Sequence, residues 1–220
     1  LDLFIRERDL EPAFRALEAV GFRTELTDPS WIGKGFQGEY FVDLIFSSGN
    51  GVAVVDDAWF ENARRATVMG VDVLVAPPEE IIWSKAFVVE RERYDGADVN
   101  HLLHACAEQM DWERLLARFD RYHEVLFSHL LLYRFVYPSE RSRVPHWVIE
   151  TLIARTLAEE ADHEQAICRG NLLSRTQYQH DYEHHGYEDG RLWDELNRAA
   201  RRGSREDTVG ERNVPPRSGG

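Results

Sequence analysis

The sequence changes its hydrophobic period at Pro77-Pro78, and this change limits the folds that the chain can adopt. Before the two prolines, short apolar runs separated by glycine, asparagine and serine predict strands. After them, apolar residues recur every three or four positions, which predicts helices. Strands that crowd the first third of a chain, followed by helices, are typical of an α+β fold. We therefore expect a small sheet followed by a helical bundle.

The spacing of apolar and turn-forming residues predicts the individual elements. We expect strands over residues 1–5, 22–26, 39–46, 66–69 and 71–75, and a glycine-rich turn region over 31–38. We expect helices over residues 9–20, 58–64, 79–92, 97–107, 112–119, 121–136 and 147–160. The last two strands meet at Gly70 and are typical of a tight hairpin.

Composition excludes several classes of protein. The 220 residues carry 26 basic and 39 acidic side chains, a formal charge of −13, which argues against broad binding to DNA or RNA. A local basic cleft stays compatible with this charge. No run approaches the roughly 18 apolar residues of a membrane span, so we expect no membrane insertion. Two cysteines argue against a disulfide framework and a cysteine-rich zinc site, and they favour a cytoplasmic location.

We expect three segments along the chain. Residues 1–78 form an α/β core, 79–200 a helical region packed on it, and 201–220 a disordered tail. The tail has almost no apolar residues, so burial cannot offset its ordering entropy. Apolar residues surround the helix predicted within 122–137, which indicates burial. Its partner is either the rest of the bundle, which we favour, or a second subunit, which would make the protein a homo-oligomer.

Two aspartates interrupt apolar strand segments. Asp2 lies in Leu-Asp-Leu-Phe-Ile and Asp43 in Val-Asp-Leu-Ile-Phe, which is the same pattern. A buried carboxylate is costly unless it meets a cation or hydrogen-bond donors. If the two strands are neighbours, both carboxylates point at one spot, and Mg²⁺ is typically bound by carboxylates together with substrate phosphates. Alternatively, each aspartate lies at a strand edge and faces water or an arginine.

Longer stretches of the chain resemble a known family. LDLFIRERDLEPAFRALEAVGF resembles the part of nucleotidyltransferase-fold proteins in which an Asp-x-Asp strand precedes a helix and a Gly-Phe turn. YFVDLIF is similar to the strand that carries their third carboxylate. PPEEIIWSKAFVVERERYDGADVNHLL resembles the helix pair after the sheet in AbiEii-like and antibiotic-adenylylating relatives. The resemblance covers roughly residues 1–103 and matches Asp2, Asp43, Lys85, Arg91 or Arg93, Asp95 and Asp98.

The resemblance implies a nucleotidyltransferase fold with a small mixed sheet and a magnesium-dependent transfer of a nucleotidyl group from an NTP to an acceptor. Asp2 and Asp43 would be the catalytic and metal-binding residues of a two-metal site, and Lys85 would bind the nucleotide. The acceptor would be a small molecule, an RNA end or a protein. The relatives include toxins of the toxin–antitoxin kind.

The family's Gly-Ser turn and first aspartate would lie before Leu1, so we expect only two of three metal-binding carboxylates in these 220 residues. We therefore expect this chain to be inactive or weakly active unless a longer natural chain supplies them. A nucleotide-transfer assay on an upstream-extended chain tests this expectation. The alternatives are a non-catalytic relative that serves as a binding or interaction module, and a helical scaffold in which Asp43 is incidental.

Lysine is rare in this sequence, because only Lys34 and Lys85 among the 26 basic residues are lysines. The Lys85 ammonium could contact a triphosphate as a compact charge. Alternatively, it pairs with Glu79 or Glu80 on a helix surface. Lys34 lies in a glycine-rich stretch without the spacing of a phosphate-binding loop, and a flexible hairpin is the simpler interpretation.

Other polar residues have simpler interpretations. Asp95 and Asp98 begin a predicted helix, where N-capping is their simplest role. All nine histidines follow residue 100, and His180, His184 and His185 cluster. Spacing of four residues can bind zinc, but the sequence has no His-Glu-x-x-His pattern or cysteine partners, so we do not expect a zinc site.

Overall fold

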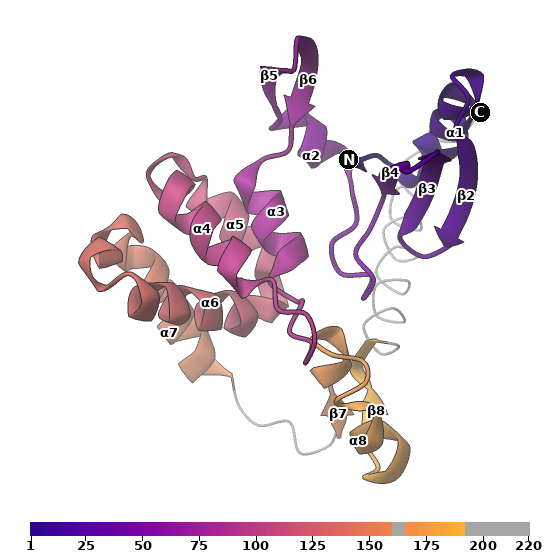
Figure 1. The fold of residues 1–220 in the computed structure, drawn as a ribbon. Coiled ribbons are helices and arrows are strands. Elements are labelled where there is room, and N and C mark those ends of the chain that lie inside the picture. The colour runs from indigo at the N-terminus through magenta and orange to yellow at the C-terminus, as the bar shows by residue number, and fades with distance from the viewer. Residues whose placement is uncertain (160–165, 192–220) are drawn as a thin grey trace, which may run out of the picture. The chain divides into compact units, whose positions relative to one another are not determined.

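The computed structural model describes residues 1–159 and 166–191 (Figure 1). The chain divides into two compact units, Leu1–Ala161 and Asp162–Gly220. The expected mixture of helices and small sheets is confirmed. The predicted tail over 201–220, and residues 192–200 of the predicted helical region, lie outside the described residues.

The first unit begins with a mixed four-stranded sheet. Its strands are β1 (Asp2–Phe4), β2 (Arg23–Asp28), β3 (Ile32–Gln37) and β4 (Tyr40–Ile45). Their order in the sheet is β1-β4-β3-β2. β1 runs parallel to β4, whereas β2–β3 and β3–β4 are antiparallel pairs. β1 is therefore an edge strand that lies next to β4 although the two are far apart in sequence.

Helix α1 (Leu10–Ala19) covers one face of this sheet (Figure 1). Its buried residues Leu10 and Phe14 pack against Val42, Leu44 and Phe46. Because side chains alternate between the two faces of a strand, the residues between these three point away from α1. The opposite face of the sheet is the one that carries the charged residues described below.

The predicted glycine-rich turn over 31–38 is wrong, because this stretch forms the regular strand β3. The glycines serve close packing instead of chain reversal. A Cβ atom at Gly33 would lie 2.6 Å from the Cζ atom of Phe14, and one at Gly35 would lie 2.8 Å from Cδ1 of Leu17. Residues without a side chain are therefore needed where α1 crosses β3.

A hairpin follows the sheet. After the short helix α2 (Asp57–Glu61), strands β5 (Arg64–Val68) and β6 (Val71–Val75) pair in antiparallel fashion. Met69 and Gly70 join them, and both have positive φ angles, 51° and 82°, as a two-residue hairpin turn of type I′ requires. The predicted hairpin is confirmed, with its apolar side chains largely exposed.

Five helices complete the first unit: α3 (Pro78–Lys85), α4 (Gly96–Cys106), α5 (Trp112–Phe119), α6 (His123–Val136) and α7 (His146–Ala158). Their buried core includes Ile82, Val99, Leu103, Leu115, Phe119, Leu126, Leu130, Val148 and Leu152. The prediction that the first of them continues to residue 92 is wrong. The chain leaves the helix after Lys85 and forms a turn in which the Glu90 N–H donates to the Arg93 carbonyl at 2.8 Å.

Helix α6 is buried along one side only. Leu126, Leu130 and Tyr133 are fully buried, whereas Phe135 is 79% exposed and its neighbours Leu131, Leu132 and Val136 are also exposed. Packing within the bundle therefore buries only part of the apolar surface of α6. The homo-oligomer, which is the less favoured alternative from the sequence, stays a prediction.

Short 3-10 turns connect several elements, at Glu7–Asp9, Ala107–Gln109, Asp120–Tyr122, Pro138–Arg143 and Gly170–Leu172. None of the described helices is long and apolar enough to cross a membrane.

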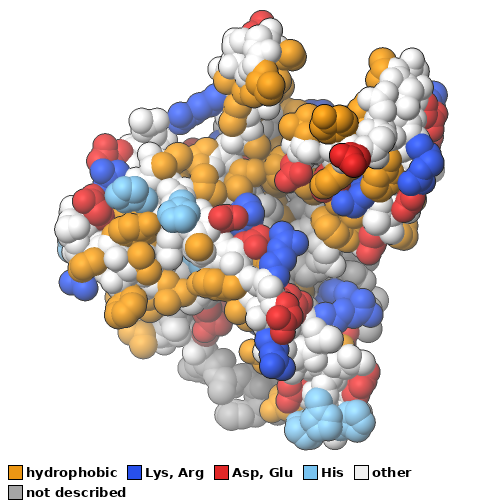
Figure 2. Space-filling model, viewed as in Figure 1, with side chains coloured by type: hydrophobic (Ala, Val, Ile, Leu, Met, Phe, Trp, Pro, Cys, Tyr) orange, Lys and Arg blue, Asp and Glu red, His pale blue; other side chains and the backbone are white. Residues whose placement is uncertain are grey.

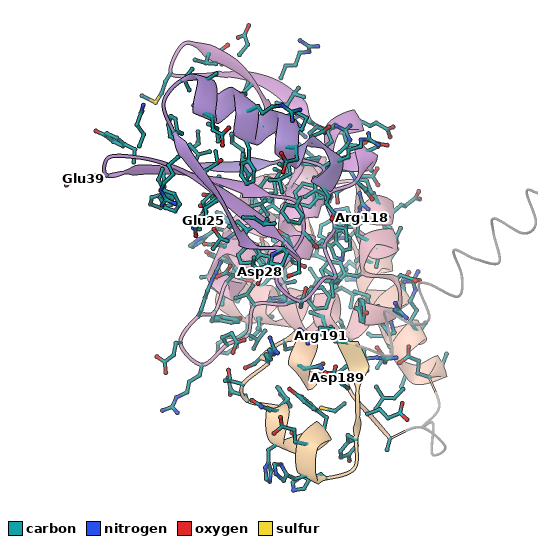
Figure 3. The ribbon with its side chains drawn as sticks, turned by 90° about the vertical axis from the view of Figure 1, so that its right-hand side faces the viewer. Glu25, Asp28, Glu39, Arg118, Asp189 and Arg191 are labelled. Atoms are coloured by element: carbon teal, nitrogen blue, oxygen red, sulfur yellow. The ribbon has the colours of Figure 1, made fainter. Side chains whose placement is uncertain are left out.

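In the second unit, strands β7 (Ile167–Cys168) and β8 (Glu188–Asp189) form a short parallel pair beside helix α8 (Gln179–His184). Asp189 accepts hydrogen bonds from the Asn171 side chain and from the Arg191 backbone N–H; Figure 3 labels Asp189 and Arg191. This carboxylate therefore connects the two ends of the described part of the unit.

An arginine on α5 connects the loop before α2 to the helical bundle. The Arg118 guanidinium, labelled in Figure 3, contacts Asp56 at 2.6 and 2.8 Å through two nitrogens. Its Nε atom lies 2.7 Å from Oε2 of Glu80, whose side chain is fully buried. Burial raises the pKa of Glu80, and the neighbouring Arg118 and Arg114 oppose that rise. Arg118 is thus the main compensating charge for a buried carboxylate.

We predict that Gly33→Ala lowers the free energy of unfolding by about 1–3 kcal/mol, because the new methyl group overpacks the contact with Phe14. Urea unfolding followed by circular dichroism measures this change. Gly49→Ala is the matched control, since the atom nearest to a Cβ added at Gly49 is Nε1 of Trp31, at 3.7 Å. Adding Phe14→Leu to Gly33→Ala should recover part of the loss, and full additivity of the two changes would contradict the assigned contact.

We predict that Arg118→Met costs about 3–5 kcal/mol of stability, because it leaves the Glu80 carboxylate buried without its main cation. Arg155→Met on the exposed surface of α7 is the control and should change stability by less than about 0.5 kcal/mol. Combining Arg118→Met with Glu80→Gln should lose less than Arg118→Met alone. An equal or larger loss in the double variant would show that the ion pair is not the cause.

Candidate functional site

Three charged residues form a row across the sheet face that points away from α1. In the strand register, Asp43 on β4 is the partner of Asp2 on the parallel neighbour β1 and of Lys34 on the antiparallel neighbour β3. Register partners present their side chains on the same face of a sheet. Glu25 on β2, labelled in Figure 3, is the register partner of Lys34 and continues the row. We call Asp2, Asp43 and Lys34 the charged row.

Asp43 is the central and least exposed member of the charged row, with 17% of its side chain accessible. The Lys34 ammonium lies 2.9 Å from its Oδ1 atom and 5.2 Å from the centroid of the Phe41 ring. The same oxygen is buried and makes no aligned hydrogen bond. The distance shows an ion pair, and the angles show that the ammonium does not fully satisfy this oxygen.

A second group of charges lies where α3 ends and α4 begins. The Lys85 ammonium contacts Oδ2 of Asp98 at 2.7 Å and Oδ2 of Asp95 at 3.4 Å. The Arg93 guanidinium donates to both oxygens of Asp95, at 3.2 and 3.1 Å. We call Lys85, Arg93, Asp95 and Asp98 the lysine cluster.

The lysine cluster holds Asp95 and Lys85 in their charged forms. Burial disfavours the Asp95 anion, but the hydrogen bonds from Arg93 and the charge of Lys85 outweigh it and lower the pKa of Asp95. Burial also disfavours the Lys85 cation, and the carboxylates of Asp98 and Asp95 reverse that effect and raise the pKa of Lys85. Asp95 and Lys85 therefore stay ionised at neutral pH.

Electrostatics connect the lysine cluster to the charged row. The pKa of Arg93 is raised chiefly by its hydrogen bond with Asp95, and the charges of Asp98 and Asp2 add to the rise. Asp2 on the edge strand is thus within electrostatic range of the Arg93 guanidinium. The lysine cluster therefore approaches the charged row at Asp2, on the edge strand β1.

The structure brings together most residues that the sequence singles out. Asp2 and Asp43 are side by side, and Lys85 contacts both Asp95 and Asp98. Of the two candidate arginines, Arg93 joins the cluster, whereas Arg91 extends to Glu92 at 3.5 Å, and both side chains of that pair are highly exposed.

Two sequence-based interpretations need correction. The hairpin expected around Lys34 is present, because β3 and β4 are antiparallel neighbours in the chain, but Lys34 lies in a regular strand that places its ammonium against Asp43. Asp95 occupies the N-cap position of α4 but makes no capping hydrogen bond with its side chain, which is only 11% exposed and is engaged by Lys85 and Arg93. The rarity of lysine is the sequence signal that could have identified Lys34 as a candidate. The chain has two lysines, and both contact aspartates of the first unit.

Histidines of the second unit lie together without converging on one point. The rings of His180 and His184 stack at 4.5 Å, and His185 meets His180 edge-on at 4.7 Å. Figure 2 shows these histidines as a pale blue group. Within residues 1–159 and 166–191, no group of three histidine, cysteine or acidic side chains could hold a metal ion by itself.

Comparison with protein-family models, with curated proteins and with solved structures found no match to this chain. The resemblance to nucleotidyltransferases therefore stays a prediction.

We predict that the lysine cluster contributes stability that is lost in acid. Because the pKa of Asp95 is lowered by folding, the unfolded chain binds a proton first, and the contribution falls as the pH drops below about 4. Urea unfolding at pH 7 and at pH 3 measures the stability lost between the two pH values. This loss should be smaller for Asp95→Asn than for the unmodified chain. The same loss in both proteins would contradict the assignment.

Proposed function

We propose that the first unit is a nucleotidyltransferase-like domain that binds a magnesium–NTP complex and transfers a nucleotidyl group to a hydroxyl group of an acceptor. The observation that carries the proposal is the charged row, in which Asp2 and Asp43 are register partners on one sheet face. The resemblance noted for the sequence assigns its metal-binding carboxylates to these two positions. The proposed location is the cytoplasm.

The residues of the charged row fit a magnesium ion. Mg²⁺ is usually bound by one or two carboxylates together with substrate phosphates, so two carboxylates can hold one ion of the expected two-metal site. Asp43 offers a buried oxygen without an aligned donor, and Asp2 is exposed beside it. When bound, Mg²⁺ supplies neutralisation of triphosphate charge and polarisation of the phosphate that is attacked.

The cations around the carboxylates suit the triphosphate. Lys34 and Lys85 are compact point charges, and the planar Arg93 guanidinium can pair with two phosphate oxygens. Each is now neutralised by an aspartate, at 2.9 Å for Lys34 and 2.7 Å for Lys85. A triphosphate that brings its own negative charge can exchange with those aspartates, which frees Asp43 for the metal ion.

The proposed reaction follows from the positions of these groups. The acceptor oxygen forms a bond to the α-phosphorus, the bond from this phosphorus to the bridging oxygen breaks, and pyrophosphate leaves. The proton of the acceptor hydroxyl passes to the Asp2 carboxylate, the exposed member of the pair. Lys34 and Lys85 stabilise the charge that develops on the leaving pyrophosphate.

A second candidate function is a binding or interaction module of the same fold without catalysis. The ion pair between Lys34 and Asp43 favours it, because a lysine beside the central carboxylate already compensates its charge. Such a module would bind NTPs through its cations without a requirement for Mg²⁺. The metal dependence of NTP binding separates the two functions.

We predict that Asp43→Asn weakens magnesium-dependent NTP binding at least tenfold, about 1.4 kcal/mol, because the metal loses its buried ligand. Isothermal titration with each of the four NTPs, with Mg²⁺ or EDTA, measures the effect. Glu39→Gln is the control, since Glu39 lies at the tip of the β3–β4 hairpin (Figure 3) and should leave binding unchanged.

The outcomes separate the two functions. NTP binding that needs Mg²⁺ and is lost in Asp43→Asn supports the transferase. Binding that is equal in EDTA and in Asp43→Asn supports the non-catalytic module. No binding of any NTP by the unmodified chain would contradict both.

A further inference from the structure

A cavity of about 560 Å³ opens beside the edge strand β1. It is bordered by β1, α2, the base of the β5–β6 hairpin, α3 and α4. Figure 2 shows hydrophobic side chains gathered below this hairpin, next to acidic and basic ones. The volume is within the range of small-molecule sites, which is roughly 300–1,000 Å³.

The lining of the cavity is mainly apolar. Phe4 and Trp59 pack with ring centroids 4.7 Å apart, and Ile81, Leu102 and Cys106 come from the two helices. Asp2 and Arg64 are the charged residues of the lining. Arg64 donates from Nη1 to Oε1 of Gln109 at 3.2 Å, so part of its donor capacity is in use. An apolar cavity with a carboxylate in its lining suits an apolar molecule that carries a hydroxyl group.

The sheet order places this cavity and Lys34 on different sides of Asp2 and Asp43. Lys34 is on β3, on one side of β4, whereas the cavity adjoins β1 on the other side. The two carboxylates lie between them. A phosphoryl group above the carboxylates would thus have the leaving pyrophosphate on the Lys34 side and the attacking group on the cavity side, as an in-line displacement requires.

The α3–α4 pair shows the same division along its length. The lysine cluster occupies the end where α3 stops and α4 starts, with Lys85 contacting Asp98. Ile81 and Leu102, further from that end, line the cavity. One helix pair therefore presents charged groups at one end and apolar groups at the other.

We propose that this cavity is the acceptor site of the nucleotidyl transfer, and that the acceptor is a small molecule with an aromatic or branched aliphatic body and one hydroxyl group. This inference rests on the proposed function. The apolar lining holds the body, and Asp2 takes the hydroxyl proton as the oxygen bonds to the α-phosphorus and pyrophosphate leaves. An RNA end is a poor fit, because the lining offers a single arginine against its phosphates.

The experiment uses 2-naphthol as the probe for the full 220-residue chain. Isothermal titration should show saturable binding that Ala63→Trp weakens at least tenfold, because Ala63 lines the cavity and the indole would fill it. Ala19→Trp on the exposed surface of α1 is the matched control and should bind the probe normally. In a Cys168→Ser background, 2-naphthol should also slow the reaction of Cys106 with a thiol reagent.

Competition and product analysis assign the role of the cavity. Mg²⁺ with each NTP should leave 2-naphthol binding unchanged, and mass spectrometry should detect a naphthyl nucleotide that does not form with 2-methoxynaphthalene, which lacks the hydroxyl. Displacement of the probe by an NTP would overturn the proposal and assign the cavity to the nucleotide base. Absence of probe binding, or binding that Ala63→Trp does not change, would also overturn it.

Failure of the proposed function gives a different result. If Asp43→Asn leaves NTP binding unchanged while Ala63→Trp abolishes probe binding, the cavity binds small apolar alcohols but the acceptor role is contradicted together with the transferase. If NTP binding responds to Asp43→Asn and an NTP displaces bound 2-naphthol, the acceptor assignment alone is contradicted.

Discussion

Close contact between α1 and the strands β3 and β4 determines how the first unit is arranged. The absence of side chains at Gly33 and Gly35 lets Phe14 and Leu17 approach the sheet, which commits one face to the apolar core. Alternation along each strand then places Lys34 and Asp43 on the other face. The parallel pairing of β1 with β4 brings Asp2 beside them. The charged row therefore results from apolar packing on the reverse side of the sheet.

Ion pairs connect the loop before α2 to the helical bundle and join the end of α3 to the start of α4. Arg118 joins the carboxylates of Asp56 and Glu80, and Lys85 and Arg93 share Asp95. Buried charges of this kind add little net stability, but removing one partner is costly. Such pairs define where each element must lie, because an element that moved away would leave a carboxylate buried without its cation.

Much of this arrangement could be predicted from sequence, because local patterns determine it. Apolar periodicity located most of the helices, and Trp112–Phe119 agrees with its predicted range. The repeated aspartate pattern was compatible with neighbouring strands for Asp2 and Asp43, and β1 does pair with β4. Strand β3 was missed because glycines in a short sequence window are typical of turns. Their actual role, close packing against α1, depends on a contact that lies outside that window. The apolar cavity was also missed, since its walls come from six separate helices and strands.

The pairing of both lysines with aspartates has a chemical consequence. Every other basic side chain among the 220 residues is an arginine, apart from the histidines, and guanidinium groups resist acylation at neutral pH. Acetylation of lysine side chains would therefore remove charge only at Lys34 and Lys85, next to Asp43, Asp95 and Asp98. A single type of modification would thus alter the electrostatics of this one region and leave the charge of the remaining side chains unchanged.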